Sequence, residues 1–168
     1  MILVALGANL PTAVHGAPRE ALEAALDGLA AAGLRIVARS RWYESAPVPP
    51  SDQPWFVNGV VLVESDLDPA AFLALLHRVE AGFGRVRRRR NEARVLDLDL
   101  LAHGKTVSGG EDGGPVLPHP RMETRAFVLL PLAEVAPGWR HPATGRSVEA
   151  LIADLPSDQA IRPLAEGE

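Results

Sequence analysis

The sequence predicts an α+β domain with a βαββαβ core, an antiparallel sheet and a C-terminal helical extension. Three observations carry this prediction. Stretches with strand character alternate with two stretches of helical spacing, proline-rich or glycine-rich segments separate them, and the last third is mostly helical. With 168 residues, 47% of them hydrophobic, the chain is expected to form one domain over residues 1–168 with its own core.

The first half of the chain is expected to contribute a strand, a helix and two further strands. The N-terminal run is apolar throughout, which is typical of a buried strand, and apolar residues then recur at helical spacing from Pro18 until Gly33, a natural stop. The two later strands are rich in β-branched and aromatic residues, and four prolines in ten residues exclude regular structure between them. The expected elements are a strand over residues 1–6, a helix over 18–33, strands over 34–43 and 55–65, and a loop over 45–54.

The second half adds a helix, a strand and the helical tail. Asp68 before Pro69 is typical of a helix N-cap, and helical spacing continues to Gly84. An arginine-rich loop then leads to the strand RVLDLDLLAHG, which turns at HGK. The expected tail is a flexible connection over residues 108–115, a short helical segment over 117–137 and a helix over 147–155. This order is that of a ferredoxin-like sheet with its helices on one face, which leaves the other face to long loops.

Composition excludes several classes of protein. The formal net charge of −4 supplies no overall positive field, so we expect binding neither to nucleic acid nor to an anionic membrane. The absence of cysteine excludes disulfides, thiolate metal ligands and thiol catalysis, and suits a reducing compartment. The N-terminal apolar run is too short to span a membrane and lacks the marks of a signal peptide, so we expect a cytoplasmic protein.

Two aspartates lie one residue apart in RVLDLDLLAHG. Because side chains alternate along a strand, Asp97 and Asp99 share one face, with Cβ atoms roughly 6 to 7 Å apart. Such a pair suits Mg²⁺, and two ions can bridge it beside a transferring phosphoryl group. The simpler interpretation is a solvated strand face. The GKT that follows at residues 104–106 is not the end of a P-loop, because the first glycine of that motif would fall at Asp99.

The arginine run that precedes this strand has more than one interpretation. Arg85–Arg90 can be a solvated loop, an RNA contact or an anion site. Arg94 and Asp97 follow within a few residues, which favours the anion site, with Arg85 and Arg94 as fork donors to phosphate oxygens.

Further candidates lie in FVN and LPHPRMETRAF. His119 stands between two prolines and suits a phosphate donor, although a lone histidine is more often structural. Phe56 and Phe127 are most simply core residues, but two rings that face one pocket can hold a flat heterocycle between them. Asn58 shares the strand face of Phe56 and offers both a donor and an acceptor to such a ring.

Three separated motifs in this order resemble the 6-hydroxymethyl-7,8-dihydropterin pyrophosphokinases of the folate pathway. They are DQPWFVNGVVLVE, GRVRRRRNEARVLDLDLLAHG and LPHPRMETRAFVLLPLAEVAP, and the likeness extends from Leu6 to about Leu155. The resemblance implies a ferredoxin-like fold and transfer of the β,γ-diphosphate of ATP to the hydroxymethyl oxygen of the pterin, with release of AMP. It also implies two Mg²⁺ ions as cofactors and ATP and the pterin as small-molecule substrates, and we expect a monomer.

The same resemblance assigns site residues in three groups. The catalytic group consists of Asp97 and Asp99, which hold both Mg²⁺ ions, with Arg85 and Arg94. The ATP-binding group consists of Glu80, Arg87, His119 and Arg125. The pterin-binding group consists of Ser45, Ala46 and Val48 through their backbone, Phe56 and Phe127 as the two rings, and Asn58 as the polar reader.

Two other functions remain open from the residues. The arginine run permits an RNA-binding module on a ferredoxin-like sheet, although RNP-type aromatic sequences are absent from this chain. The paired aspartates also permit a Mg²⁺-dependent phosphoryl or nucleotidyl transferase with another acceptor.

Overall fold

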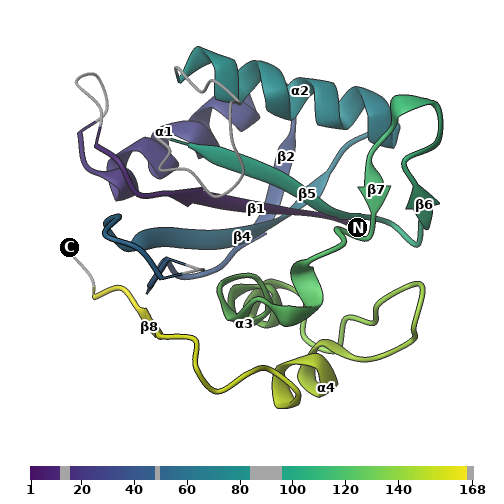
Figure 1. The fold of residues 1–168 in the computed structure, drawn as a ribbon. Helices are drawn as coiled ribbons and strands as arrows, with labels where there is room; N and C mark the ends of the chain where they lie inside the picture. Colours follow the sequence, from purple (N-terminus) through teal and green to yellow (C-terminus); the bar gives the residue numbers. More distant parts are fainter. Residues whose placement is uncertain (12–15, 48–49, 84–95, 166–168) are drawn as a thin grey trace.

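The structure is a computed structural model that describes residues 1–11, 16–47, 50–83 and 96–165 (Figure 1). Its strands are β1 (Ile2–Ala8), β2 (Arg35–Arg39), β3 (Tyr43–Ser45), β4 (Phe56–Glu64), β5 (Asp97–His103), β6 (Ser108–Gly109), β7 (Val116–Leu117) and β8 (Ile161–Pro163). Its helices are α1 (Pro18–Ala31), α2 (Pro69–Gly82), α3 (Ala126–Val135) and α4 (Val148–Ala153), and 3-10 turns lie at Glu111–Gly113 and Met122–Thr124. The predicted βαββαβ order of the core is confirmed, because β1, α1, β2, β4, α2 and β5 follow one another along the chain.

The main sheet has the strand order β5-β1-β4-β3-β8, and β2 also pairs with β4. Each of these pairings is antiparallel. The first strand of the chain therefore lies between β4 and β5, as the ferredoxin-like order requires. The sequence did not predict β8, which extends the sheet beyond β3 and ends at Pro163, a residue that suits an edge strand because it has no N–H to donate.

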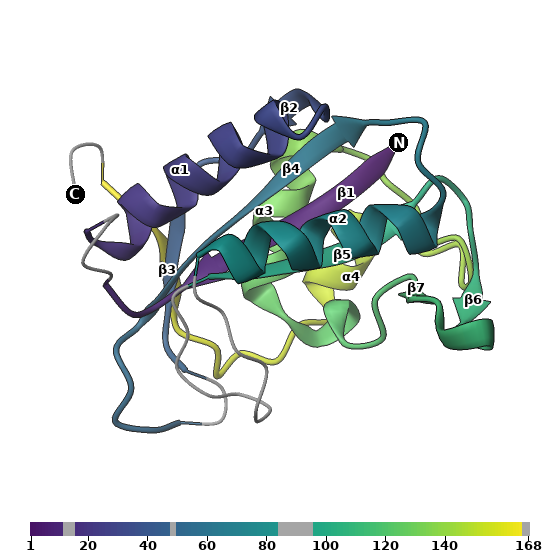
Figure 2. The same cartoon turned by 90° about the horizontal axis from the view of Figure 1, so that it is seen from above.

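Helices cover both faces of this sheet. Figures 1 and 2 show α1 and α2 side by side on one face, and α3 and α4 on the other. The first face packs against Leu22, Leu26, Phe72 and Leu76, and the second against Val128, Leu129 and Leu132. The prediction that long loops occupy the second face was therefore wrong, because the apolar α3 packs along β4.

A register shift interrupts the pairing of β5 with β1. Val4 pairs with Leu100 and Leu3 pairs with Ala102, so Leu101 is an extra residue between two pairs. Alternation along β5 places Leu100 in the core under α1 and α2 and Leu101 in the core under α3, and the extra residue lets Ala102, the partner of Leu3, lie on the α3 side together with Leu101.

The predicted strand over residues 34–43 is broken in two by a tertiary contact. Ser40 lies at the break, where its hydroxyl accepts a hydrogen bond from the Val60 N–H (3.0 Å). The Trp42 ring lies against Gly59, at which a Cβ atom would stand 2.6 Å from ring carbons. Only a glycine allows this approach, and the chain resumes as β3 up to Ser45, which was wrongly assigned to the loop.

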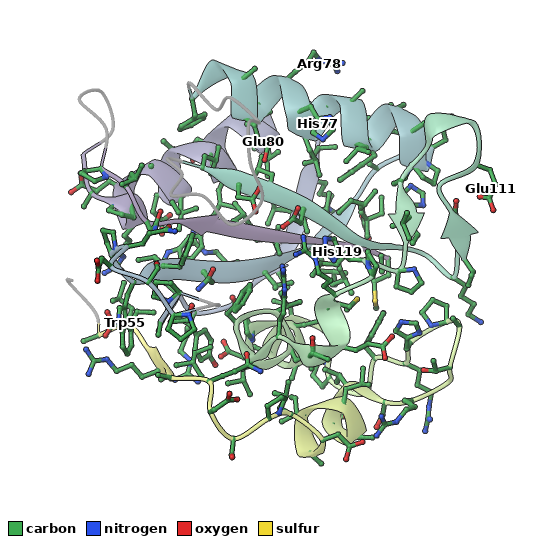
Figure 3. All side chains as sticks on the ribbon, viewed as in Figure 1. Trp55, His77, Arg78, Glu80, Glu111 and His119 are labelled. Carbon is green, nitrogen blue, oxygen red and sulfur yellow. The ribbon has the colours of Figure 1, made fainter. Side chains whose placement is uncertain are left out.

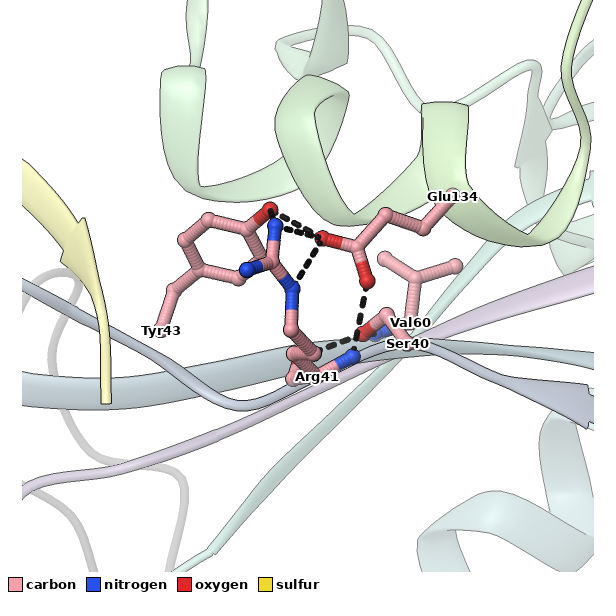
Figure 4. Close-up of polar contacts among 5 residues, drawn as sticks. All are labelled: Ser40, Arg41, Tyr43, Val60 and Glu134. Atoms are coloured by element: carbon pink, nitrogen blue, oxygen red, sulfur yellow. Dashed lines mark hydrogen bonds and ion pairs between the residues drawn. The ribbon is translucent and has the colours of Figure 1, made fainter. Parts of the chain in front are cut away.

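A polar cluster attaches α3 to the strand break (Figure 4). Glu134 on α3 accepts hydrogen bonds from the Arg41 N–H (2.9 Å) and the Arg41 Nε–H (3.2 Å), and the Tyr43 hydroxyl donates to the same carboxylate. Burial alone would raise the pKa of Glu134, but the hydrogen bonds from Tyr43 and Arg41 outweigh it and lower the pKa below its ordinary value.

Two smaller predictions differ from the structure. Residues 108–115, predicted as a flexible connection, contain β6 and the first 3-10 turn, and β6 pairs with β7 directly after them. Helix α2 ends at Gly82 rather than at Gly84, which lies outside the described residues. In the part of the chain that the structure describes, no helix is both long and apolar enough to cross a membrane.

Candidate active site

The two aspartates of β5 lie together on the α3 side of the sheet. Asp97 pairs with Gly7 and Asp99 with Ala5, and the leucines that alternate with them belong to the opposite core, which confirms that both carboxylates share one face. Burial, the charge and hydrogen bonding of Asp97 and the charge of Glu80 raise the pKa of Asp99 to about 8, against an opposing effect of Arg125. The two carboxylates therefore repel each other when both are ionised, and a cation between them would relieve this repulsion.

Glu80 reaches toward this strand from α2 (Figure 3). Its side chain is 1% exposed, and its Oε2 accepts a hydrogen bond from the Leu98 N–H (2.7 Å), the amide between the two aspartates. This contact fixes the position of β5 at the carboxylate pair. A role of Glu80 at the nucleotide, which the resemblance implies, stays a prediction.

The floor of the site is formed by β1, β3 and β4 beside the aspartates. Asn58 pairs with Gly7 across the sheet, and Gly7 pairs with Asp97 on its other side, so the three residues form one row. Asn58 is 5% exposed, and its Nδ2 donates to the Ser45 hydroxyl (2.8 Å). The sequence-based prediction missed Gly7, because it ended the first strand at Leu6 whereas β1 continues to Ala8; a glycine inside a strand is a signal of close approach.

Arg125 borders the site from the start of α3. Its guanidinium lies over the Phe127 ring, 5.3 Å from the ring centroid. The same charge acts on both Asp99 and His119. The structure thus brings Arg125, Phe127 and His119 together opposite the aspartate strand.

His119 is neutral at physiological pH. Burial and the positive charges of Arg125 and Arg121 lower the pKa of His119 to about 4, although Asp97 opposes this shift. The Arg121 N–H donates to His119 Nδ1 (3.3 Å), so the ring proton is on Nε2. His119 therefore offers an uncharged N–H donor.

The two candidate rings differ in their surroundings. Phe127 packs against the core under α3. Phe56 lies on β4 two residues before Asn58, half-buried, and belongs to neither core among the described residues. An arrangement in which both rings face one ligand stays a prediction, as does the backbone role of Ala46, whose N–H donates to the Ala160 carbonyl (3.0 Å).

Four predicted site residues lie outside the described residues: Val48, Arg85, Arg87 and Arg94. They belong to the segments that precede β4 and β5, the strands that carry Asn58 and the aspartates.

Comparisons with known proteins agree on one family of pterin pyrophosphokinases. The sequence profile of a family described as 7,8-dihydro-6-hydroxymethylpterin-pyrophosphokinase matches residues 3–137. The chain is 42% identical over 156 residues to a 2-amino-4-hydroxy-6-hydroxymethyldihydropteridine pyrophosphokinase of Pseudomonas aeruginosa, a match that covers 92% of the chain and 91% of the relative. It is 44% identical over 134 residues to a protein of the same name from Methylorubrum extorquens, covering 79% of the chain and 80% of the relative. A folic acid synthesis protein of Pneumocystis carinii is 31% identical over 163 residues, which are 97% of this chain and 21% of that protein.

Proposed function

The chain belongs to the 7,8-dihydro-6-hydroxymethylpterin-pyrophosphokinase family, and we propose the following roles for its residues in the reaction of this family. The protein is an ATP-dependent pyrophosphokinase, which transfers the β,γ-diphosphate of ATP to the hydroxymethyl oxygen of the dihydropterin in folate synthesis. The RNA-binding alternative is not favoured, since the family acts on small molecules.

Asp97 and Asp99 hold two Mg²⁺ ions in this proposal. The donor set fits the ion, because two adjacent carboxylates keep one proton to about pH 8 in its absence. Within the described residues no three acidic, histidine or cysteine side chains gather into a complete metal site. Mg²⁺ commonly binds through one or two carboxylates and takes its other ligands from substrate phosphates and water. When bound, Mg²⁺ supplies charge neutralisation on the phosphate oxygens.

Cationic and neutral donors bind the phosphates of ATP. Arg125 lies near enough to the carboxylate pair for its charge to act on Asp99, and it presents a planar fork of donors that matches phosphate oxygens. His119 donates through Nε2 without adding charge. Arg85, Arg87 and Arg94 complete the set in this proposal.

Transfer of a diphosphate needs no nucleophilic side chain from the protein, because the hydroxymethyl oxygen of the pterin attacks. Positioning and charge neutralisation then account for the acceleration.

The pterin lies on the floor formed by β3 and β4. Asn58 is buried and held by the Ser45 hydroxyl, so its amide has a fixed direction from which to read the polar edge of the ring. Phe56 and Phe127 bind the two faces of the ring, and Ala46 and Val48 make backbone contacts in this proposal. We also propose that the protein is a single-domain cytoplasmic monomer.

The carboxylate pair carries this proposal, and steady-state kinetics test it. We expect ATP, Mg²⁺ and hydroxymethyldihydropterin to yield AMP, and chelation of Mg²⁺ to stop the reaction. Asp97→Ala should lower kcat by at least about 100-fold, because the carboxylates act on the transition state. Phe56→Ala should mainly raise the KM for the pterin.

Asp27→Ala, at an exposed position of α1, is the control and should leave both kcat and the KM for the pterin unchanged. Equal effects of Asp97→Ala and Phe56→Ala would refute the division of roles.

A further inference from the structure

The segment that follows α4 returns to the sheet beside the active site. Residues Ile161–Pro163 pair with β3, including Ile161 with Ser45. On either side of this pairing, the Ala46 N–H donates to the Ala160 carbonyl (3.0 Å) and the Leu164 N–H to the Trp42 carbonyl (2.8 Å). The segment lies beyond residues 3–137, which the family profile matches, and its backbone is held in place along the strand that carries Ser45.

Gln159 precedes β8 and binds the start of α3. Its Oε1 accepts a hydrogen bond from the Ala126 N–H (2.9 Å), and its Nε2 donates to the Thr124 carbonyl (2.7 Å). The amide therefore bonds the backbone immediately before and immediately after Arg125. Arg125 occupies the N-cap position of α3 and makes no side-chain cap, and Gln159 satisfies the first N–H of the helix, that of Ala126.

This double hydrogen bond restricts the backbone from which the guanidinium of Arg125 projects. Arg125 has an extended backbone, at φ −114° and ψ 108°, between the 3-10 turn and α3. Two hydrogen bonds to a planar amide, one on each side, oppose rotation of the peptide units about this residue. The place of the guanidinium over the Phe127 ring, and its closeness to Asp99, on which its charge acts, depend on that backbone.

We propose that Gln159 is a positioning residue for the diphosphate transfer: its side-chain amide clamps the backbone on both sides of Arg125 and so holds the guanidinium at the phosphates. This inference rests on the proposed phosphate-binding role of Arg125. Gln159 itself touches neither substrate in this proposal, and it acts through Arg125. A well-oriented group contributes far more than the same group free to move, so loss of the clamp should lower the rate without removing the charge.

The test compares kinetics of Gln159→Ala with matched controls. We expect kcat/KM for ATP to fall about tenfold, with most of the loss in kcat. Ser147→Ala removes the side-chain cap of α4, because the Ser147 hydroxyl accepts from the Ala150 N–H (3.1 Å). Asp158→Ala changes the exposed residue that precedes Gln159. Both controls should stay within twofold of the wild type in kcat/KM, even where the melting temperature falls. Gln159→Met, which keeps the length of the side chain without its amide, should lose as much activity as Gln159→Ala and serves if the alanine variant folds poorly.

A double-mutant cycle separates the two proposals. Arg125→Ala alone should be strongly impaired, and adding Gln159→Ala should cost little more, because the clamp then has nothing to position. If Arg125→Ala is impaired but Gln159→Ala and Gln159→Met match the controls, or if the losses multiply, the positioning role of Gln159 is overturned. If Arg125→Ala itself is fully active, the proposed role of Arg125 fails.

Discussion

Gly7→Ala should weaken pterin binding while leaving the fold intact. A Cβ atom at this position would stand 2.9 Å from Asn58 Oδ1, so this oxygen must retreat by about 0.5 Å to reach ordinary contact. Asn58 is held on its other side by the hydrogen bond to Ser45 and cannot move without disturbing it. Extra atoms in a packed site usually cost about 1 to 3 kcal/mol, and the lower part of this range applies because only the end of one side chain must shift. A loss of about 1 to 2 kcal/mol raises the KM for the pterin about 5- to 30-fold.

The assay is the steady-state rate at saturating ATP and Mg²⁺ over a series of pterin concentrations, with thermal denaturation as a check on folding. Gly28→Ala is the matched control, because a Cβ atom there meets only Val79 Cγ1 at 3.7 Å. This variant should keep its kinetic constants and gain slightly in stability, since alanine favours a helix over glycine. A folded Gly7→Ala variant whose KM for the pterin stays within twofold of the wild type would refute the assignment of Asn58 as the polar reader.

Three further predictions concern the surroundings of the site. Glu134→Gln should lower the melting temperature at pH 7, because hydrogen bonds such as that from Tyr43 hold the pKa of Glu134 below 4.5 and its carboxylate stabilises the fold once ionised. The difference in melting temperature from the wild type should shrink as denaturation is repeated toward about pH 3, where the carboxylate becomes protonated. A difference that stays constant with pH would contradict this account. Gly59→Ala should destabilise the protein by about 1 to 3 kcal/mol in urea unfolding, because the new methyl group collides with the Trp42 ring; unchanged stability would show that the ring moves freely. Glu80→Gln keeps an acceptor for the Leu98 N–H of β5 but removes a negative charge beside the aspartates. Mg²⁺ should therefore bind less tightly to this variant in calorimetry, and tighter binding would contradict that reasoning.

Local pattern was sufficient to predict most of the fold. The elements of the βαββαβ core follow from apolar periodicity and from caps such as Asp68, whose side chain accepts from the Ala71 N–H (2.8 Å). The coverage of the second face could not be derived, because α3 is apolar almost throughout and its periodicity indicates no single buried face. The break in the second strand depends on the contact of Trp42 with Gly59, 17 positions along the chain, which no local pattern contains.

In the candidate site, too, local pattern predicted the relations within one strand but not those between distant segments. Alternation along β5 was enough to place Asp97 and Asp99 on one face, because that relation lies within a single strand. The row from Asp97 through Gly7 to Asn58 depends on the register of three strands. The contacts of Gln159 join positions more than 30 residues apart through a strand of three residues, too short to give a periodic signal.

The separation of the two apolar cores by the sheet has a consequence for motion at the site. Each core is a distinct cluster of buried side chains, and we therefore expect the α3 layer to open locally at a free energy below that of global unfolding. Arg125 and Phe127 belong to that layer, whereas Asp97 and Asp99 belong to a strand bonded along β1. Local opening of α3 should therefore change the distance between the Arg125 guanidinium and the two carboxylates but not the distance between the carboxylates themselves. Amide hydrogen exchange should accordingly be faster in α3 than in β1.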